Sequence, residues 1–252
     1  MAQSVERFSS RVENYVRYRP GYPIEIIDLL ENECGLTSKS LVADVGSGTG
    51  KLSEPFLQNG NVVIGVEPNA GMREAAEALL KQHPGFKNIN GTAEATTLPS
   101  SSVDLVVAGQ AFHWFDAVAT RTEWKRILKP GGWVVLVWNE RRVDTTPFLR
   151  DYEELLCNYS IDYPVVRHEK AAERINIFFA PATPQTVCFS NNQEFDFEAL
   201  KGRLLSSSYT PEPGHPNFEP MITRLKEIYD RHEESGRVRF DYDTRVFYGG
   251  IG

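Results

Sequence analysis

Three alternate glycines follow a short apolar segment in the sequence VADVGSGTG, residues 42–50. Glycine reaches positive φ and has no Cβ, so a backbone rich in glycine turns sharply and lets a ligand come close. The apolar residues predict a strand, and a helix is predicted directly after the glycines. In an α/β protein, a strand-to-helix turn of this kind is where nucleotide-like ligands bind, beyond the carboxyl end of the strand.

The spacing of these glycines excludes two better-known phosphate-binding motifs. The dinucleotide fingerprint G-x-G-x-x-G needs glycine at position 51, where the chain has Lys51. A P-loop needs glycine five residues before its Gly-Lys pair and serine or threonine after it. Those positions hold Val45 and Leu52. The motif that remains is D-x-G-x-G-x-G, which starts at Asp44.

Apolar strands alternate with helical segments between residues 41 and 139, and this alternation predicts a parallel sheet covered on both faces. Pro130-Gly131-Gly132 ends the last helix of this series and leads into its last strand. The expected strands are Leu41–Val45, Val62–Glu67, Lys87–Asn90, Val103–Ala108 and Trp133–Trp138, and the expected helices are residues 50–58, 71–82 and 116–128.

The chain on either side of this region has a different pattern. The segment Ile161–Pro184 has no clean period, and Tyr209–Pro220, with four prolines, predicts a loop. In the first 40 residues a helix is expected, broken at Pro20 and Pro23 before a second helix begins near Ile24. The remaining expected elements are helices at 147–158, Phe197–Ser206 and Phe218–Glu233 and strands at Gln185–Phe189 and Arg237–Phe247.

Composition excludes several classes of protein. The net charge of −7 argues against a nucleic-acid surface, which usually needs a basic patch. No apolar run approaches the roughly 20 residues that span a bilayer, and no signal-peptide core is expected at the N-terminus, so a cytoplasmic protein without a membrane partner is predicted. The cysteines, Cys34, Cys157 and Cys188, are too far apart for a metal or disulfide framework and are expected to be buried free thiols. No metal is expected.

An acidic residue, Glu67, ends the second expected strand. A carboxylate at this position can accept hydrogen bonds from the two hydroxyls of a ribose. Both NAD and S-adenosylmethionine sites share that feature, so it indicates the kind of ligand only in combination with the glycine spacing. The structural alternative is a carboxylate that caps the N-terminus of the next helix.

Together these motifs resemble motif I and its neighbours in the class I S-adenosylmethionine-dependent methyltransferases, specifically over residues 40–140. Tyr18–Pro23, the run His113-Trp114-Phe115-Asp116 and Tyr242–Tyr248 more loosely resemble a subgroup that includes trans-aconitate methyltransferases. The resemblance implies a Rossmann-like, doubly wound, seven-stranded α/β sheet with the last strand antiparallel, plus a helical lid. It also implies S-adenosyl-L-methionine as cofactor.

The resemblance assigns a cofactor site. Asp44 would face the ammonium of the methionine moiety, unless loop N–H groups satisfy it, and both roles are compatible. Met72 would cover one adenine face or else belong to the core. Thr92 stands where the family often has Asp for the adenine amino group, so Glu94 or a backbone group would replace that contact. The complete expected set is Asp44, Gly46, Ser47, Gly48, Gly50, Glu67, Pro68, Met72, Thr92, Ala93, Glu94 and Gln110.

The acceptor side of the site is expected at Tyr18, Arg19, His113 and Trp114. His113 is the candidate catalytic base, with a purely structural hydrogen bond as its alternative. Trp114 would pack beside the sulfonium or an apolar acceptor. Arg19 is a candidate carboxylate clamp, because guanidinium binds carboxylate through two hydrogen bonds, and a surface ion pair is its alternative.

The sequence thus predicts a single methyltransferase domain over residues 1–252. We expect lid helices at 1–40, a cofactor-binding core at 41–140, a lid and substrate segment at 141–220, and a last helix and strand at 221–252 that complete the sheet. The predicted activity is methyl transfer to a small molecule, with carboxylates among the candidate acceptors. An inactive or regulatory S-adenosylmethionine-binding protein of the same fold is the main alternative. A dehydrogenase is disfavoured by Lys51, and the oligomeric state is not predicted.

Overall fold

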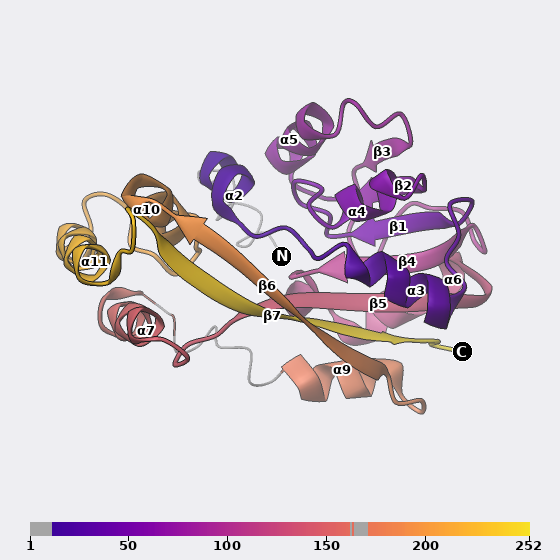
Figure 1. Cartoon of the computed structure of the whole chain (residues 1–252). Coiled ribbons are helices and arrows are strands. Elements are labelled where there is room, and N and C mark those ends of the chain that lie inside the picture. The colour runs from indigo at the N-terminus through magenta and orange to yellow at the C-terminus, as the bar shows by residue number, and fades with distance from the viewer. Residues whose placement is uncertain (1–11, 162, 164–170) are drawn as a thin grey trace.

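The computed structural model describes residues 12–161, 163 and 171–252. Its centre is a seven-stranded sheet in the order β3-β2-β1-β4-β5-β7-β6 (Figure 1). Strands β1 to β5 pair in parallel, and β7 runs antiparallel to both of its neighbours. The predicted fold class, with its antiparallel last strand, is confirmed. The strands are β1 Leu41–Val45, β2 Val62–Val66, β3 Phe86–Ile89, β4 Val103–Gly109, β5 Leu128–Arg141, β6 Gln185–Phe195 and β7 Val238–Gly249.

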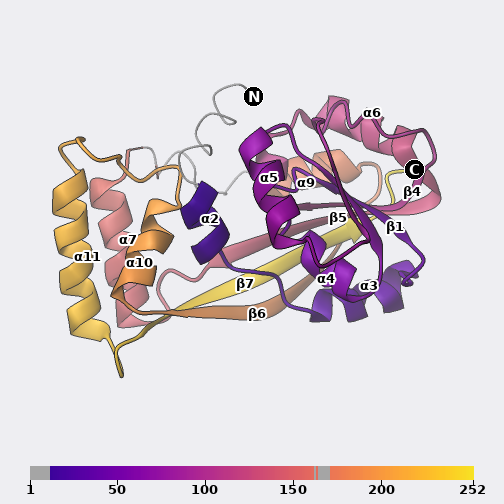
Figure 2. The ribbon, with the colours of Figure 1, turned by 90° about the horizontal axis from the view of Figure 1, so that it is seen from above.

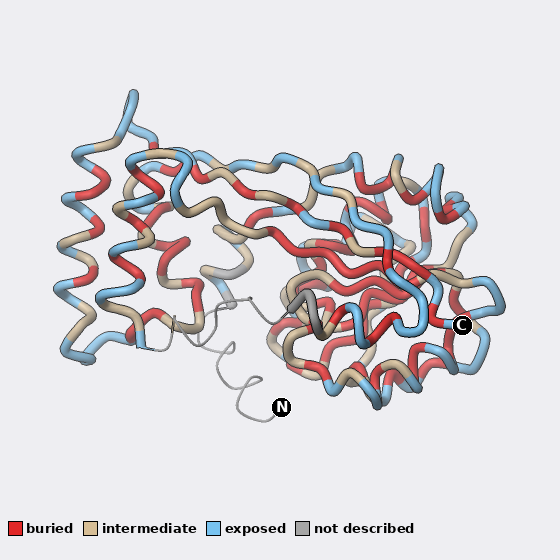
Figure 3. Tube along the Cα trace, turned by 90° about the horizontal axis from the view of Figure 1, so that it is seen from below, coloured by how far each residue is buried: buried red, intermediate tan, exposed pale blue. Residues whose placement is uncertain are grey.

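Helices cover both faces of the sheet because successive strand residues point to opposite sides. Along β4, Val106 belongs to the core under α6 (Ala117–Ile127) and α9 (Ala171–Phe179), whereas Leu105 and Val107 face α3 (Glu25–Cys34) and α4 (Ser53–Gln58). The helix after β2 is α5 (Ala70–Leu79). Figure 3 shows that buried residues gather along the central strands, while outward helix faces are exposed.

Three long strands, β5, β7 and β6, extend beyond the part of the sheet that is formed by β1 to β4, and they support a second group of helices. These are α7 (Pro147–Tyr159), α10 (Phe197–Leu205) and α11 (Phe218–His232), which we call the cap (Figure 2). The cap has its own apolar core, in which Leu149, Leu200 and Leu225 pack with Phe240 of β7. The extended strands therefore connect the two cores continuously.

The first described helix, α2 (Val12–Tyr18), lies mainly against α10 of the cap and also contacts α5 (Figures 1 and 2). A Cβ at Gly202 of α10 would lie 2.0 Å from the Tyr18 ring, so glycine there is what allows the contact. After Tyr18 the chain crosses to α3 as an extended segment. Residues 1–11, where part of the N-terminal helix was expected, lie outside the described residues.

Three expectations about elements were incomplete. Strand β5 begins at Leu128, so Pro130-Gly131-Gly132 lie within it instead of leading into a strand at Trp133. The segment Ile161–Pro184 contains α9, which the absence of a clean period did not indicate. Strand β6 continues to Phe195 instead of ending at Phe189. Its second half is polar, yet every residue of it pairs with β7, from Gln185 opposite Tyr248 to Phe195 opposite Val238. The length of β6 is therefore determined by its pairing with β7, and the apolar periodicity of the sequence does not indicate such pairing.

The expected burial of all three cysteines was wrong for two of them. All are free thiols, but Cys157 and Cys188 are exposed and Cys34 alone is buried. Cys157 follows the inward-facing Leu155 and Leu156 on α7 and faces outward. Cys188 lies on the open face of β6, the edge strand. Among the described helices, none is both long and apolar enough to cross a membrane.

Candidate active site

The glycine loop after β1 has three residues at positive φ, but they meet different surroundings. A Cβ at Gly46 would lie 2.7 Å from the Cβ of Ala111, and one at Gly50 would lie 2.5 Å from Leu80 Cδ1. At Gly48, with φ of 54°, a Cβ would meet nothing within 4 Å. Gly46 and Gly50 therefore permit packing inside the protein, whereas Gly48 leaves open space above the loop. That is the shape expected where a ligand approaches the backbone.

Asp44, the last residue but one of β1, is fully buried at the base of this loop. The Ser53 hydroxyl donates to Oδ2 at 2.7 Å, and Oδ1 accepts no hydrogen bond from the described residues. The pKa of Asp44 is raised to about 7, mainly by burial and less by the nearby Glu67 charge, against the lowering effect of the Ser53 hydrogen bond. A buried carboxylate oxygen without a donor is costly and is suited to a cationic ligand group.

Glu67 follows β2 and holds two loops together. Its Oε2 accepts from the Gly48 N–H at 3.0 Å, and its Oε1 accepts from the Asn69 N–H at 2.9 Å. Burial raises the pKa of Glu67, and these two donors oppose the shift. The alternative role as a helix cap is wrong, because Asn69 caps α5 by accepting from the Met72 N–H.

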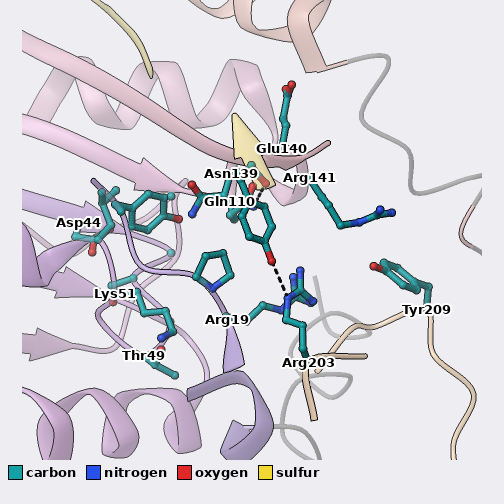
Figure 4. A pocket seen from close by; sticks show the side chains of 18 of the residues that line it. Arg19, Asp44, Thr49, Lys51, Gln110, Asn139, Glu140, Arg141, Arg203 and Tyr209 are labelled. Carbon is teal, nitrogen blue, oxygen red and sulfur yellow. Dashed lines mark hydrogen bonds between the residues drawn. The ribbon is translucent and has the colours of Figure 1, made fainter. Parts of the chain in front are cut away.

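A cavity of about 430 Å³ lies where the glycine loop meets the cap (Figure 4). One end is the glycine loop and the carboxyl ends of β1 and β4, and the other is the underside of the cap. It is lined by Arg19, Pro20, Tyr22, Asp44, Gly46, Ser47, Gly48, Thr49, Lys51, Leu52, Gly109, Gln110, Asn139, Glu140, Arg141, Val143, Tyr163, Arg203, Tyr209 and Tyr242.

The segment between α2 and α3 forms one wall of this cavity. A Cβ at Gly109 would lie 2.4 Å from the Tyr22 hydroxyl, so the Tyr22 ring covers the end of β4. The Gly21 carbonyl accepts from the side-chain amides of Asn139 on β5 and Asn191 on β6, each at 3.0 Å. Residues 19–22 are therefore fastened to the sheet.

Several expected site residues meet in the cavity. Asp44, Gly46, Ser47 and Gly48 line it at the loop, Gln110 lines it at the end of β4, and Arg19 lines it near the cap. Gln110 has a positive φ of 56°, and its side chain donates to the Asn139 carbonyl at 2.9 Å. The expected residues that do not line it are Tyr18, Gly50, Glu67, Pro68, Met72, Thr92, Ala93, Glu94, His113 and Trp114. Their roles stay predictions.

The expected adenine-side residues lie around β3 and the start of α6. Met72 is buried on α5. Thr92 pairs with Ala95 through backbone hydrogen bonds. Glu94 Oε1 accepts from the Asp116 N–H at 3.0 Å, whereas its buried Oε2 has no hydrogen-bond donor among the described residues. One carboxylate oxygen of Glu94 is thus buried and unused among the described residues.

His113 and Trp114 form a single 3₁₀ turn (η1, Phe112–Trp114), with their ring centroids 4.8 Å apart. Arg174 of α9 donates to the His113 carbonyl at 3.1 Å and to the Phe115 carbonyl at 2.7 Å. The turn is therefore fixed through its backbone from the α9 side of the sheet.

Comparison with known proteins identifies the family. A family model described as a methyltransferase domain matches residues 43–136. A methyltransferase-like protein of Schizosaccharomyces pombe is 34% identical over 98% of this chain and 97% of its own length. A methyltransferase of Mycobacterium tuberculosis is 40% identical over 53% of this chain and 52% of its own. The chain belongs to the class I S-adenosylmethionine-dependent methyltransferases. It is an enzyme of that family.

Solved structures agree on the fold. A structure from Anaeromyxobacter dehalogenans, described as a type II methyltransferase, has a TM-score of 0.69 at 22% identity and covers 93% of this chain and 98% of its own. A methyltransferase described as part of an antibiotic biosynthesis pathway in Anabaena variabilis has a TM-score of 0.63, with 93% and 99% covered. At these identities the likeness concerns the fold alone.

The residues of this methyltransferase fit its family cofactor. S-adenosylmethionine carries an ammonium, a carboxylate, a ribose and an adenine but no phosphate. Asp44 Oδ1 offers an unused buried acceptor, and Gly48 leaves open space beside it. Ser47 and Thr49 also present buried hydroxyl groups without a hydrogen-bond partner among the described residues.

Sequence reasoning missed most of the cap-side wall of the methyltransferase cavity. Arg141, Tyr163, Arg203, Tyr209 and Tyr242 were not expected there. The sequence pattern around one of them, Arg203, is unusual. Arg203 lies between Leu200 and Leu204 on the inward face of α10, so a cation interrupts the apolar face of an amphipathic helix. The others come from β5, β7, the loop after α10 and the segment before α9, and their positions depend on how the cap packs.

Proposed function

We propose that this methyltransferase transfers a methyl group from S-adenosylmethionine to a small anionic molecule held in the cavity between the glycine loop and the cap. Three observations support the proposal. The cavity of about 430 Å³ is within the range of small-molecule sites. The unused Oδ1 of Asp44 lies at one end of it. Cationic side chains, Arg19, Arg141 and Arg203, lie toward the other.

The proposed cofactor contacts follow from these groups. Asp44 would accept from the ammonium, and Glu67 would accept from the ribose while it keeps the Gly48 and Asn69 contacts. Glu94 Oε2 is our candidate acceptor for the adenine amino group. The predicted roles of the other residues around β3 and α5, including Met72, are retained in this proposal.

When bound, S-adenosylmethionine supplies a methyl group on a positively charged sulfur, which is already an activated leaving group. The protein then has to exclude water and hold the acceptor atom within roughly 3–3.5 Å of that methyl. Tyr22, Tyr209 and Tyr242 would exclude water, and we propose that residues 12–22 and the cap act as the lid.

The acceptor atom decides whether a base is needed. A carboxylate acceptor is already a nucleophile and needs none. For a hydroxyl acceptor, His113 is our candidate base, with Trp114 beside it. A His113→Gln variant separates these cases, since a carboxylate reaction keeps its rate and pH profile, whereas a hydroxyl reaction loses rate by about 10²-fold or more.

Two experiments test the proposed function. Calorimetry with S-adenosylhomocysteine should give saturable binding that NAD does not reproduce. A screen of small carboxylates and alcohols with labelled S-adenosylmethionine should then find methyl transfer. Failure of S-adenosylhomocysteine to bind would refute the proposal. Binding without transfer to any acceptor would instead favour a regulatory protein of this fold.

A further inference from the structure

Arg203 is a buried cation without a matching carboxylate. It lies on α10, is 6% exposed and lines the cavity. Its Nη1 donates to the Ser207 hydroxyl at 3.2 Å, and its Nε donates to the Tyr242 hydroxyl at 3.4 Å. Both partners are neutral, and no carboxylate of the described residues forms an ion pair with Arg203. Burying a charge with only neutral partners is expensive.

A second guanidinium shares the Ser207 hydroxyl. Arg19 Nη2 lies 3.4 Å from this oxygen and donates to the Ser206 carbonyl at 3.0 Å. Two arginines therefore converge on one neutral oxygen at the cap end of the cavity, and like charges that lie this close raise each other's energy. An anion bound beside Arg203 would offset the cost of burying that charge.

The carboxylates around the cavity do not neutralise Arg203. Arg141 is paired with Glu153, which also accepts from the Tyr163 hydroxyl at 2.7 Å. Glu140 is paired with Arg245 at 2.7 Å, so it does not neutralise Arg203. Asp44 lies at the opposite end, under the glycine loop. In a chain with net charge −7, this concentration of positive charge in a cavity points to a specific ligand.

From these contacts we infer that Arg203, Ser207 and Tyr242 form an anion subsite that recognises a carboxylate of the methyl acceptor. The inference rests on the proposed function and adds the residue that selects the substrate. Guanidinium forms two parallel hydrogen bonds with a carboxylate, and Ser207 and Tyr242 fix the orientation of Arg203 for them. The subsite lies at the cap end, so it binds the acceptor and leaves the Asp44 end to the cofactor.

The test uses matched acid and amide probes: phenylacetate with phenylacetamide, and glutarate with glutaramide. Each is titrated by calorimetry into the full-length protein, with and without saturating S-adenosylhomocysteine. We expect the acids to bind at least about tenfold more tightly than their amides, because only a carboxylate forms charged hydrogen bonds with guanidinium.

Two variants assign this preference to Arg203. Arg203→Met should abolish it, and Arg203→Lys should retain part of it. The control is Arg142→Met, which removes a surface arginine paired with Asp243 and should bind the acids like the wild type. The thermal midpoint of unliganded Arg203→Met should equal or exceed that of the wild type, because no carboxylate of the described residues loses a partner. A merely structural Arg203 would instead lower the midpoint.

Several results would overturn the inference. These are equal binding of acids and amides, failure of every acid to bind, or unchanged acid binding by Arg203→Met. If the wild type does not bind S-adenosylhomocysteine, the proposed function is contradicted separately. The acid titrations in the absence of S-adenosylhomocysteine still measure the subsite.

Discussion

The Ser53 hydroxyl donates a 2.7 Å hydrogen bond to one oxygen of Asp44, and the other oxygen has no donor among the residues that the structure describes. Ser53 begins α4, and Asp44 lies near the end of β1, so the position of this carboxylate is determined by the two elements that flank the glycine loop. The arrangement fixes its orientation without neutralising it. A cationic group that enters the loop would complete its coordination.

We expect the affinity for S-adenosylhomocysteine to fall as the pH decreases below about 7. Burial raises the pKa of Asp44 to about 7, so its ionised form is lost below that pH. A protonated carboxyl cannot pair with the ligand ammonium, and the affinity should drop by up to about tenfold per pH unit. Calorimetry between pH 5.5 and 8 measures this slope. Asp44→Asn should bind weakly throughout with a shallower slope, and a flat wild-type profile would contradict the assignment.

Asp44 should also destabilise the unliganded protein at neutral and higher pH. Its pKa is about 7 when folded and near 3.8 when unfolded, so the folded state binds more protons between these values. The stability that this carboxyl contributes is complete below about pH 4 and is lost as the pH rises through 7. Thermal midpoints should therefore show Asp44→Asn gaining on the wild type from pH 4 to 8. An advantage that does not grow with pH would contradict burial as the cause.

Gly48 should be required for ligand approach rather than for folding. Gly48→Ala places a methyl group in open space above the loop and keeps a residue at φ of 54°. Gly35→Ala is its control, because Gly35 has φ of 66° and equally open surroundings at the end of α3. Each variant should lose roughly 1–2 kcal/mol of stability. Only Gly48→Ala should also lower the affinity for S-adenosylhomocysteine, by about tenfold or more. An equal loss of affinity in both variants would refute this role.

The cofactor half of the site was predictable from sequence because its elements are local and regular. The glycine spacing placed Asp44 and Gly48 together, and parallel pairing of β1 with β2 brought Glu67 to the same loop. The acceptor half was not, because it depends on how far β5 and β7 extend and how the cap packs on them. Arg203 is one residue among apolar neighbours until α10 is placed over the cavity.

The contact between Tyr18 and Gly202 gives a way to open the proposed lid without deleting it. In Gly202→Ala the new Cβ would fall 2.0 Å from the Tyr18 ring, so that ring has to move away from its present position on α10. Alanine is a better helix former than glycine, so α10 itself should not weaken. We expect binding of S-adenosylhomocysteine to stay within about twofold of wild type, while methyl transfer falls by about tenfold or more, since lid closure completes the site.

The matched control is Gly250→Ala, where the added Cβ would meet no described atom within 4 Å beyond its chain neighbours, and this variant should transfer methyl groups at the wild-type rate. Hydrogen exchange at residues 12–22 should be faster in Gly202→Ala than in this control, because α2 loses packing contacts with α10 of the cap. If exchange there speeds up but methyl transfer does not fall, α2 is not part of the lid. If neither changes, Tyr18 accommodates the methyl group by a local shift, and α2 is held on the cap by its other contacts.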